Sequence, residues 1–293
     1  MTCREGIKMT NTMTISKEKQ RAKVVSTIIY IFLVFLAIIY IVPLLWVLIT
    51  SLKDDSTLML SPWAMPASIE WGNYEFAWTK GHLGTAMLNS LIVCSTTLVI
   101  SMLFGSMAAF AIAKLRWKLS KIALYYFLIG MMIPIHTILI PLFVQFSGWK
   151  MSNSLIGIII PYITFSLPIT IYIMVGFFEG IPNELFEAAC IDGCSVYKMF
   201  GTVAIPLAKT GFMVTGLMSF VSNWNELLLA MVFISDEAKK TLPVSLTKFV
   251  GPYHTNYCQM FAAIMIAIVP TIIAYVAFAN QIVEGLTAGA VKG

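Results

Sequence analysis

The chain has 293 residues, of which 59% are hydrophobic and only 11% are charged, and its formal net charge is +5. Its mean hydropathy of +0.86 excludes a water-soluble globule, because too few polar side chains are available to cover the surface of one. The excess of cations is typical of inner loops that attract anionic membrane lipid, and it does not indicate nucleic-acid binding. We therefore expect an integral membrane protein.

Six apolar stretches follow one another along the chain. Each exceeds the roughly 20 residues that a helical span needs, and none contains Lys, Arg or Asp. Because the apolar runs are continuous, without short alternating segments, they favour an all-α protein over a barrel. The predicted spans are residues 24–50, 87–113, 122–145, 155–178, 210–234 and 260–283.

The chain then reads as a basic segment, 1–23, followed by one six-span membrane domain, 24–293. The first span resembles a signal peptide, but it is too long and has no small-residue cleavage site, so we expect it to be retained. With the first segment inside, 13 of the 19 Lys and Arg residues lie on the inner side, including those of "KLRWKLSK" at 114–121. The positive-inside rule therefore predicts that both termini are cytoplasmic.

Chemical motifs are absent from the sequence. It has no P-loop, no H-E-x-x-H and no G-x-S-x-G, so a self-contained pump or hydrolase is disfavoured and we expect no bound cofactor. Only Glu226 is acidic within the spans, which disfavours a proton relay of carboxylates. Cys190 and Cys194 have a helical spacing that suits either a metal or helix packing. If the protein moves a solute uphill, we expect a partner to use ATP.

The polar segment 182–209 lies between the fourth and fifth predicted spans, on the cytoplasmic side. Pro182 and Asn183 are typical of a helix start, acidic residues follow in the first turn, and Gly193 is typical of a helix stop. The sequence therefore predicts a short exposed helix that ends in a glycine turn.

A second helix is expected after the glycine, because apolar residues recur on one face before Pro206, at Val196, Phe200 and Val203. In the first helix, Ala188 and Ala189 would leave one side with almost no projecting side chains, so that another protein could approach closely. Two helices joined by a glycine turn at the inner membrane surface would form a docking site. A plain amphipathic connector is the alternative.

The same segment resembles a family signature. The membrane permease subunits of bacterial ABC importers carry E-A-A, three residues, Gly, nine residues and then I-x-L-P. This chain has that spacing, with Val and Ile replacing Ile and Leu near the end. In the family this loop contains the coupling helix, which sits in a cleft of the ATP-hydrolysing subunit. The resemblance implies a coupling role for Glu187, Ala188, Ala189, Asp192, Gly193 and Pro206.

Further stretches resemble the carbohydrate branch of the family, and within it the maltose-type second permease subunit. These are "PLLWVLITSLK", "NSLIVCSTT", "NWNELLLAMVFI", "TLPVSL" and the terminal "GAVKG". The resemblance implies six spans with both termini inside, a second permease subunit of different sequence, two ATP-binding subunits and an extracytoplasmic solute-binding protein. It also implies a second ATPase contact at Lys292 and Gly293, for which a floppy tail is the alternative.

Polar side chains within the spans are candidates for a sugar path, since they are costly in lipid unless they face a cavity or a partner. These candidates are Asn89, His136, Asn223, Trp224, Asn225 and Glu226. Hydrogen bonding between helices is the alternative for each of them. In the family, a heterodimeric pore can also place most sugar contacts on the other subunit.

Three functions remain to be distinguished. The first is the permease subunit of an ATP-driven sugar importer in the bacterial cytoplasmic membrane. The second is a stand-alone secondary carrier or channel for small solutes, and the third is a membrane-embedded enzyme. The missing catalytic motifs disfavour the third, and the resemblance favours the first.

Overall fold

The structure is a computed structural model that describes residues 3–115, 117–251 and 255–290. Within these residues the regular elements are helices, and the one isolated β-bridge joins Val250 and Thr255. The chain divides into two compact units, Met1–Glu70 and Trp71–Gly293.

The first unit consists of two helices. α1 (Cys3–Ser51) is continuous and contains the apolar stretch Lys23–Ser51. Its 29 residues extend about 44 Å at 1.5 Å per residue, which exceeds the roughly 30 Å of hydrocarbon in a bilayer. α2 (Asp55–Leu60) is capped by Asp54, whose carboxylate accepts hydrogen bonds from the Ser56 and Thr57 hydroxyls and the Thr57 amide. These hydrogen bonds, of which the one from Ser56 has the largest effect, hold the pKa of the Asp54 carboxyl well below its usual range.

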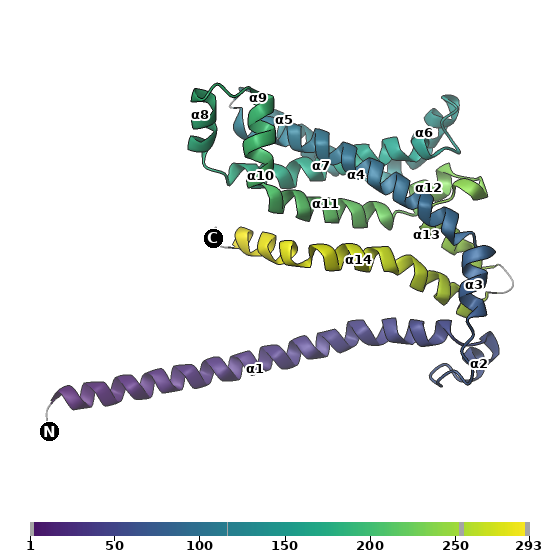
Figure 1. The fold of residues 1–293 in the computed structure, drawn as a ribbon, viewed down its shortest axis with the longest axis horizontal. Coiled ribbons are helices and arrows are strands. Elements are labelled where there is room, and N and C mark those ends of the chain that lie inside the picture. The colour runs from purple at the N-terminus through teal and green to yellow at the C-terminus, as the bar shows by residue number, and fades with distance from the viewer. Residues whose placement is uncertain (1–2, 116, 252–254, 291–293) are drawn as a thin grey trace. The chain divides into compact units, whose positions relative to one another are not determined.

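The second unit contains the remaining helices (Figure 1). They are α3 (Gly72–Thr79), α4 (Leu83–Lys114), α5 (Ser120–Met131), α6 (Ile135–Gly148), α7 (Leu155–Glu179), α8 (Asn183–Ile191), α9 (Val196–Met199), α10 (Ile205–Leu207), α11 (Lys209–Trp224), α12 (Leu228–Phe233), α13 (Leu242–Leu246) and α14 (Tyr257–Ala290). A π-helical turn η1 (Phe200–Ala204) and two 3₁₀ turns, η2 (Glu237–Lys239) and η3 (Thr247–Phe249), complete the unit.

The packing of α4 against α7 forms the centre of this unit. At Gly105 an added Cβ would lie 2.7 Å from the Thr170 methyl carbon, so the two helices approach as closely as they do only because residue 105 has no side chain. Thr170 is itself fully buried and donates a hydrogen bond to the Ser166 carbonyl of its own helix. Small residues thus replace bulky apolar ones where the helix backbones meet.

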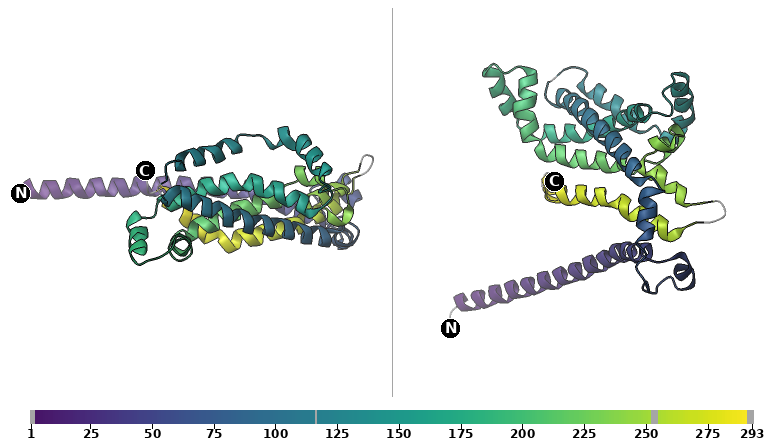
Figure 2. Two further views of the ribbon diagram at one scale, coloured as in Figure 1. Left: turned by 90° about the horizontal axis from the view of Figure 1, so that it is seen from above. Right: turned by 45° about the vertical axis from the view of Figure 1, so that its right-hand side comes forward.

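Four of the six predicted spans are single helices, within α1, α4, α7 and α14. The prediction of one helix at 122–145 is wrong, because the region consists of α5 and α6, which meet at 89° (Figure 2). Pro134 explains this corner, since it has no backbone N–H and disfavours the helical conformation of the residue before it. By length and composition, the described part of the chain has four helices able to cross a membrane, or up to six if each bent pair counts as one span.

The prediction of a continuous helix at 210–234 is also wrong. α11 ends at Trp224 and α12 begins at Leu228. The break coincides with Glu226, whose carboxylate accepts hydrogen bonds from the backbone N–H groups of Leu229 (2.8 Å) and Ala230 (3.2 Å) at the start of α12. An acidic side chain that satisfies these N–H groups allows a new helix to start within an otherwise apolar stretch.

Candidate functional site

The segment 182–209 begins with α8, a helix that ends in a glycine turn, as the sequence predicts. After α8, the Gly193 N–H donates to the Cys190 carbonyl and the Cys194 N–H donates to the Ala189 carbonyl, both at 3.0 Å. Gly193 has φ +75°, which is the left-handed conformation that glycine adopts without strain. This pair of hydrogen bonds is a Schellman motif, and it fixes the direction in which the chain leaves α8.

The inward side of α8 belongs to the protein core. Phe186 and Ala189 are buried, and Phe186 packs 5.7 Å from the ring of Phe110 on α4. The prediction that Ala188 and Ala189 share an exposed side is therefore wrong for Ala189. Successive residues of a helix lie about 100° apart, so that Ala188 faces outward while its neighbour packs inward.

The outward side of this segment carries large apolar side chains that the sequence analysis missed. Ile191 is 87% exposed, Tyr197 is 78% exposed, and Leu185 is also exposed. The spacing of Leu185, Ala188 and Ile191 by three residues is a signal that would have identified this face. We call Leu185, Ala188, Ile191 and Tyr197 the docking face, after the docking site that the sequence predicts in this segment.

The second half of the segment returns the chain to the membrane domain. Ser195 caps α9 by accepting a hydrogen bond from the Lys198 N–H. Of the three apolar residues predicted to share one face, Phe200 and Val203 pack against the core, whereas Val196 is exposed. The other predicted coupling residues, Glu187, Asp192 and Pro206, are exposed.

A cavity of about 250 Å³ lies within the membrane domain, between α6, α7, α11 and α12. Its wall carries hydroxyl, amide and carboxylate groups, from Tyr162, Ser166, Thr170, Thr215, Ser219, Ser222, Asn223 and Glu226. Two of the predicted path residues, Asn223 and Glu226, thus meet at one cavity.

Hydrogen bonds hold both of these residues in place. The Asn223 amide donates to the Ser166 hydroxyl at 3.2 Å and to the Ser219 hydroxyl at 3.3 Å. Glu226 accepts a hydrogen bond from the Tyr162 hydroxyl in addition to the two backbone N–H groups of α12. The carboxylate therefore combines a structural role with a position on the cavity wall.

Two other predicted path residues lie away from this cavity. Asn89 donates hydrogen bonds to the carbonyls of Ala238 (2.9 Å) and Lys240 (3.0 Å), which connects α4 to the segment before α13. Trp224 is only 2% exposed, stacks on Phe220 and donates to the Ala267 carbonyl on α14. Since its ring stacks on Phe220 and is almost inaccessible to solvent, Trp224 is not an open platform in this structure, and its place in the sugar path stays a prediction.

The remaining predicted residues are placed differently. His136, in the first turn of α6, is exposed and does not line the polar cavity. Asn225 borders a second cavity of about 280 Å³ together with Trp224. Lys292 and Gly293 lie outside the described residues. Among the residues that the structure describes, no group of three His, Cys, Asp or Glu side chains could hold a metal ion, at Cys190 and Cys194 or elsewhere.

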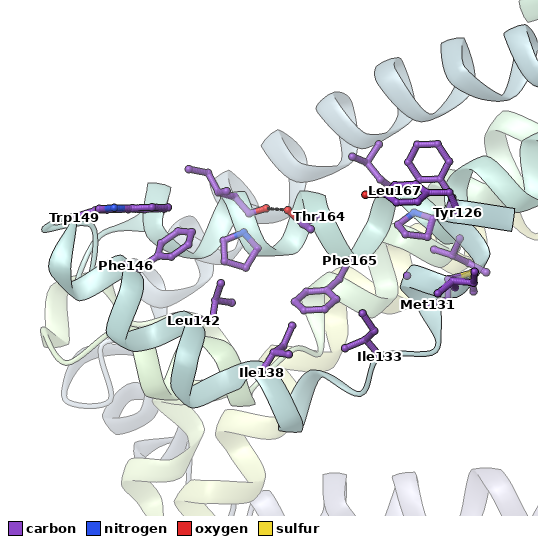
Figure 3. Close-up of a pocket in the computed structure, with 17 residues that line it drawn as sticks. Tyr126, Met131, Ile133, Ile138, Leu142, Phe146, Trp149, Thr164, Phe165 and Leu167 are labelled. Carbon is purple, nitrogen blue, oxygen red and sulfur yellow. Dashed lines mark hydrogen bonds between the residues drawn. The ribbon is translucent and has the colours of Figure 1, made fainter. Parts of the chain in front are cut away.

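A larger groove of about 720 Å³ lies between α5, α6 and α7. Figure 3 shows Ile133, Ile138, Leu142 and Phe165 around it. The hydroxyl of Thr164 is engaged with the Ile160 carbonyl of its own helix. Because the groove offers few hydrogen-bonding groups, it suits a sugar less well than the smaller polar cavity does, in spite of its volume.

Comparison with known proteins identifies the class to which this fold and loop belong. Residues 101–284 match the family described as "Binding-protein-dependent transport system inner membrane component". The chain is 32% identical to the diacetylchitobiose uptake system permease protein NgcG of Streptomyces coelicolor, over 88% of this chain and 86% of that one. It is 35% identical to the sulfoquinovosyl glycerol transport system permease protein SmoH of Agrobacterium fabrum, over 86% of this chain and 88% of that one.

The fold agrees with this assignment. A chain of a bacterial ABC transporter involved in the import of the acidic polysaccharide alginate superposes with a TM-score of 0.76, at 22% identity, over 88% of this chain and 96% of that one. The protein therefore belongs to the binding-protein-dependent transport system inner membrane components. It is an ABC transporter permease, a multi-pass protein of the cytoplasmic membrane.

The hydrogen bonds of Glu226 generate a first prediction. Glu226→Ala leaves the Tyr162 hydroxyl and two helix N–H groups without their acceptor, so we expect the free energy of unfolding to fall by about 1–3 kcal/mol. Asn225→Ala, at the neighbouring exposed amide, should change it by less than about 0.5 kcal/mol. Thermal denaturation of the purified protein in detergent measures both, and equal midpoints for the two variants would contradict the capping role.

Proposed function

We propose that this chain forms one half of the pore of an ATP-driven, binding-protein-dependent importer of a sugar or oligosaccharide. Its partners in this proposal are a second permease subunit, two ATP-binding subunits and an extracytoplasmic solute-binding protein. ATP is hydrolysed on the partner subunits and no cofactor is bound by this chain. The observation that carries the proposal is α8, because a helix with an exposed apolar face occurs at the E-A-A spacing of a family whose members couple to ATPases.

The sugar class rests on two supports. The relatives named above take up diacetylchitobiose and sulfoquinovosyl glycerol by their names. The hydroxyl and amide groups around Asn223 are also suited to replace water around sugar hydroxyls, since a buried polar ligand needs a hydrogen-bonding partner for each group that it loses from water.

The size of the polar cavity limits what this subunit contacts. Pockets that enclose a whole drug-sized ligand have volumes of roughly 300–1,000 Å³, and this cavity has about 250 Å³. It therefore suits part of an oligosaccharide, and the second permease subunit supplies the other side of the path.

Coupling depends on the rigidity of α8. Its docking face contacts the ATP-binding subunit, with Glu187 and Ala188 at the contact, while Phe186 and Ala189 anchor the opposite side in the core. The Schellman motif at Gly193 restricts rotation between α8 and α9. A displacement of α8 by the ATPase therefore reaches the membrane helices instead of being absorbed within the loop.

The membrane topology in this proposal has six spans, in which α5 with α6 and α10 with α11 each form part of a bent span. Both termini and α8 lie in the cytoplasm, because the inner segments carry 13 of the 19 Lys and Arg residues. The C-terminal residues Lys292 and Gly293 then lie on the same side as the ATP-binding subunits, which permits a second contact.

The energy source is tested by reconstitution. The purified chain alone in liposomes should neither hydrolyse ATP nor accumulate sugar, because it has no P-loop. With its partner subunits and sugar-loaded binding protein, uptake of disaccharides or short oligosaccharides should require ATP, while amino acids should not be taken up. Radiolabelled uptake and phosphate release measure both, and ATP hydrolysis by the pure chain would refute the proposal.

Topology is tested with reporter fusions. A reporter that is active only in the cytoplasm should be active when fused after Lys118 or at Gly293, and inactive when fused after Lys239. The reason is the concentration of cations in the inner segments. The reverse pattern of activity would overturn the assignment of inside and outside.

The coupling loop is tested at its glycine. Gly193→Val should reduce sugar uptake strongly, because valine at φ +75° strains the turn, at a cost on the order of 1 kcal/mol or more. Gly193→Asn is the matched control, since asparagine tolerates this conformation and an added side chain meets open space there. Both proteins should insert normally, as judged by their abundance in the membrane.

Charge at the contact is tested by Glu187→Lys. Glu184 is the acidic residue in the first turn of α8, so Glu184→Lys loses a favourable helix-dipole term of roughly 0.3–1 kcal/mol. Glu187 lies beyond this turn and loses less, so any larger effect of Glu187→Lys reports contact with the ATPase. We expect lower uptake and weaker co-purification of the ATPase for Glu187→Lys. Normal uptake and normal ATPase retention in both Glu187→Lys and Gly193→Val would show that the loop is only a connector.

A further inference from the structure

Lys114 connects the inner end of α4 to the start of α8. It is the last residue of α4, and its ammonium group donates hydrogen bonds to the Ile181 carbonyl at 2.7 Å and to the Asn183 side-chain oxygen at 2.9 Å. The same ammonium lies 5.4 Å from the centre of the Phe186 ring. All three contacts fall within six residues of chain, where α7 ends and α8 begins.

These contacts resist separation of the two helices. Hydrogen bonds from an ammonium group are shorter and stronger than neutral ones, and a cation above an aromatic ring adds a further attraction. Ile181 and Phe186 are buried, which partly shields two of the contacts from water, whereas the hydrogen bond to Asn183 is exposed. No side chain caps α8 at Pro182, so the polar contacts of Lys114 join the packing of Phe186 on Phe110 in fixing the start of α8 to α4.

The other end of α4 is held in a comparable way. Asn89 donates to the carbonyls of Ala238 and Lys240, and the Ser90 hydroxyl accepts a hydrogen bond from the Leu242 N–H at 2.8 Å. By the topology proposed above, this segment lies on the outer side. A continuous, proline-free helix with Asn89 near one end and Lys114 at the other spans about 38 Å between them.

We propose that α4 acts as a strut between the coupling helix and the outer segment 238–242, and that Lys114 is the positioning residue that joins α8 to this strut. Asn89 is the positioning residue at the opposite end. The inference rests on the proposed function. A displacement of α8 by the ATPase moves the inner end of α4, and the close packing of α4 on α7 at Gly105 prevents α4 from absorbing it by bending. When the binding protein contacts the outer segment, the resulting displacement passes along α4 in the opposite direction, to α8.

The first test uses the reconstituted complex and Lys114→Met. We expect stimulation of ATP hydrolysis by sugar-loaded binding protein to fall about 5-fold or more, the lower end of typical allosteric couplings, while unstimulated hydrolysis continues. Lys114→Arg keeps the charge and the donors, and it should restore most of the stimulation. Lys118→Met removes the same charge from an exposed position of the same basic segment and should behave as the unmodified protein does.

A milder variant guards against misfolding of Lys114→Met. Asn183→Ala removes only one acceptor of the ammonium group, at an exposed residue, and should cause a smaller loss of stimulation. The strut itself is tested by Asn89→Leu alone and combined with Lys114→Met. If the two sites act independently, their losses of stimulation multiply in the double variant. If they are two ends of one strut, the double variant loses no more stimulation than the more affected single variant.

Each outcome decides the inference. Normal stimulation in both Lys114→Met and Asn183→Ala, an equal loss in Lys118→Met, or no recovery in Lys114→Arg would overturn the role of Lys114. If the losses of stimulation in Asn89→Leu and Lys114→Met multiply in the double variant, the proposal that α4 acts as a strut is overturned. If the unmodified complex shows no stimulation by the binding protein at all, the proposed function fails instead.

Discussion

The need to satisfy every backbone hydrogen-bonding group inside a membrane governs this structure. A helix satisfies its own groups, so it can stop within the apolar region only where the sequence supplies a substitute. At Pro134 the missing N–H removes one such group, and at Glu226 a carboxylate accepts two N–H groups directly. The positions of the breaks, and the polar cavity that forms beside one of them, follow from this requirement.

Much of the fold can be predicted from the sequence, because hydropathy over about 20 residues is a strong signal. The glycine turn after α8 is predicted as well, since φ +75° at Gly193 is a local property of the chain. The break at Glu226 is not, because a single acidic residue hardly alters the mean hydropathy of the span around it. Recognising it requires the direction of the side chain, which here points to the N–H groups of the following helix.

Candidate path residues were harder to predict for a related reason. Asn223 and Trp224 are adjacent in the sequence, yet one lines the polar cavity and the other packs between α11 and α14. Adjacent residues of a helix point in directions about 100° apart, and residue type alone does not give the direction. In α8 the same geometry divides Ala188 from Ala189, so that one helix both contacts the core and leaves a free surface.

The contact between Gly105 and Thr170 has a consequence for the comparison of related sequences. With an added Cβ only 2.7 Å from the threonine methyl carbon, the combined volume of the two positions is close to its upper limit, since helix interfaces have little free space. A larger residue at 105 is compatible with this backbone only together with a smaller one at 170. The two positions should therefore vary together among homologues, and their covariation would record the register of α4 against α7 without a structure.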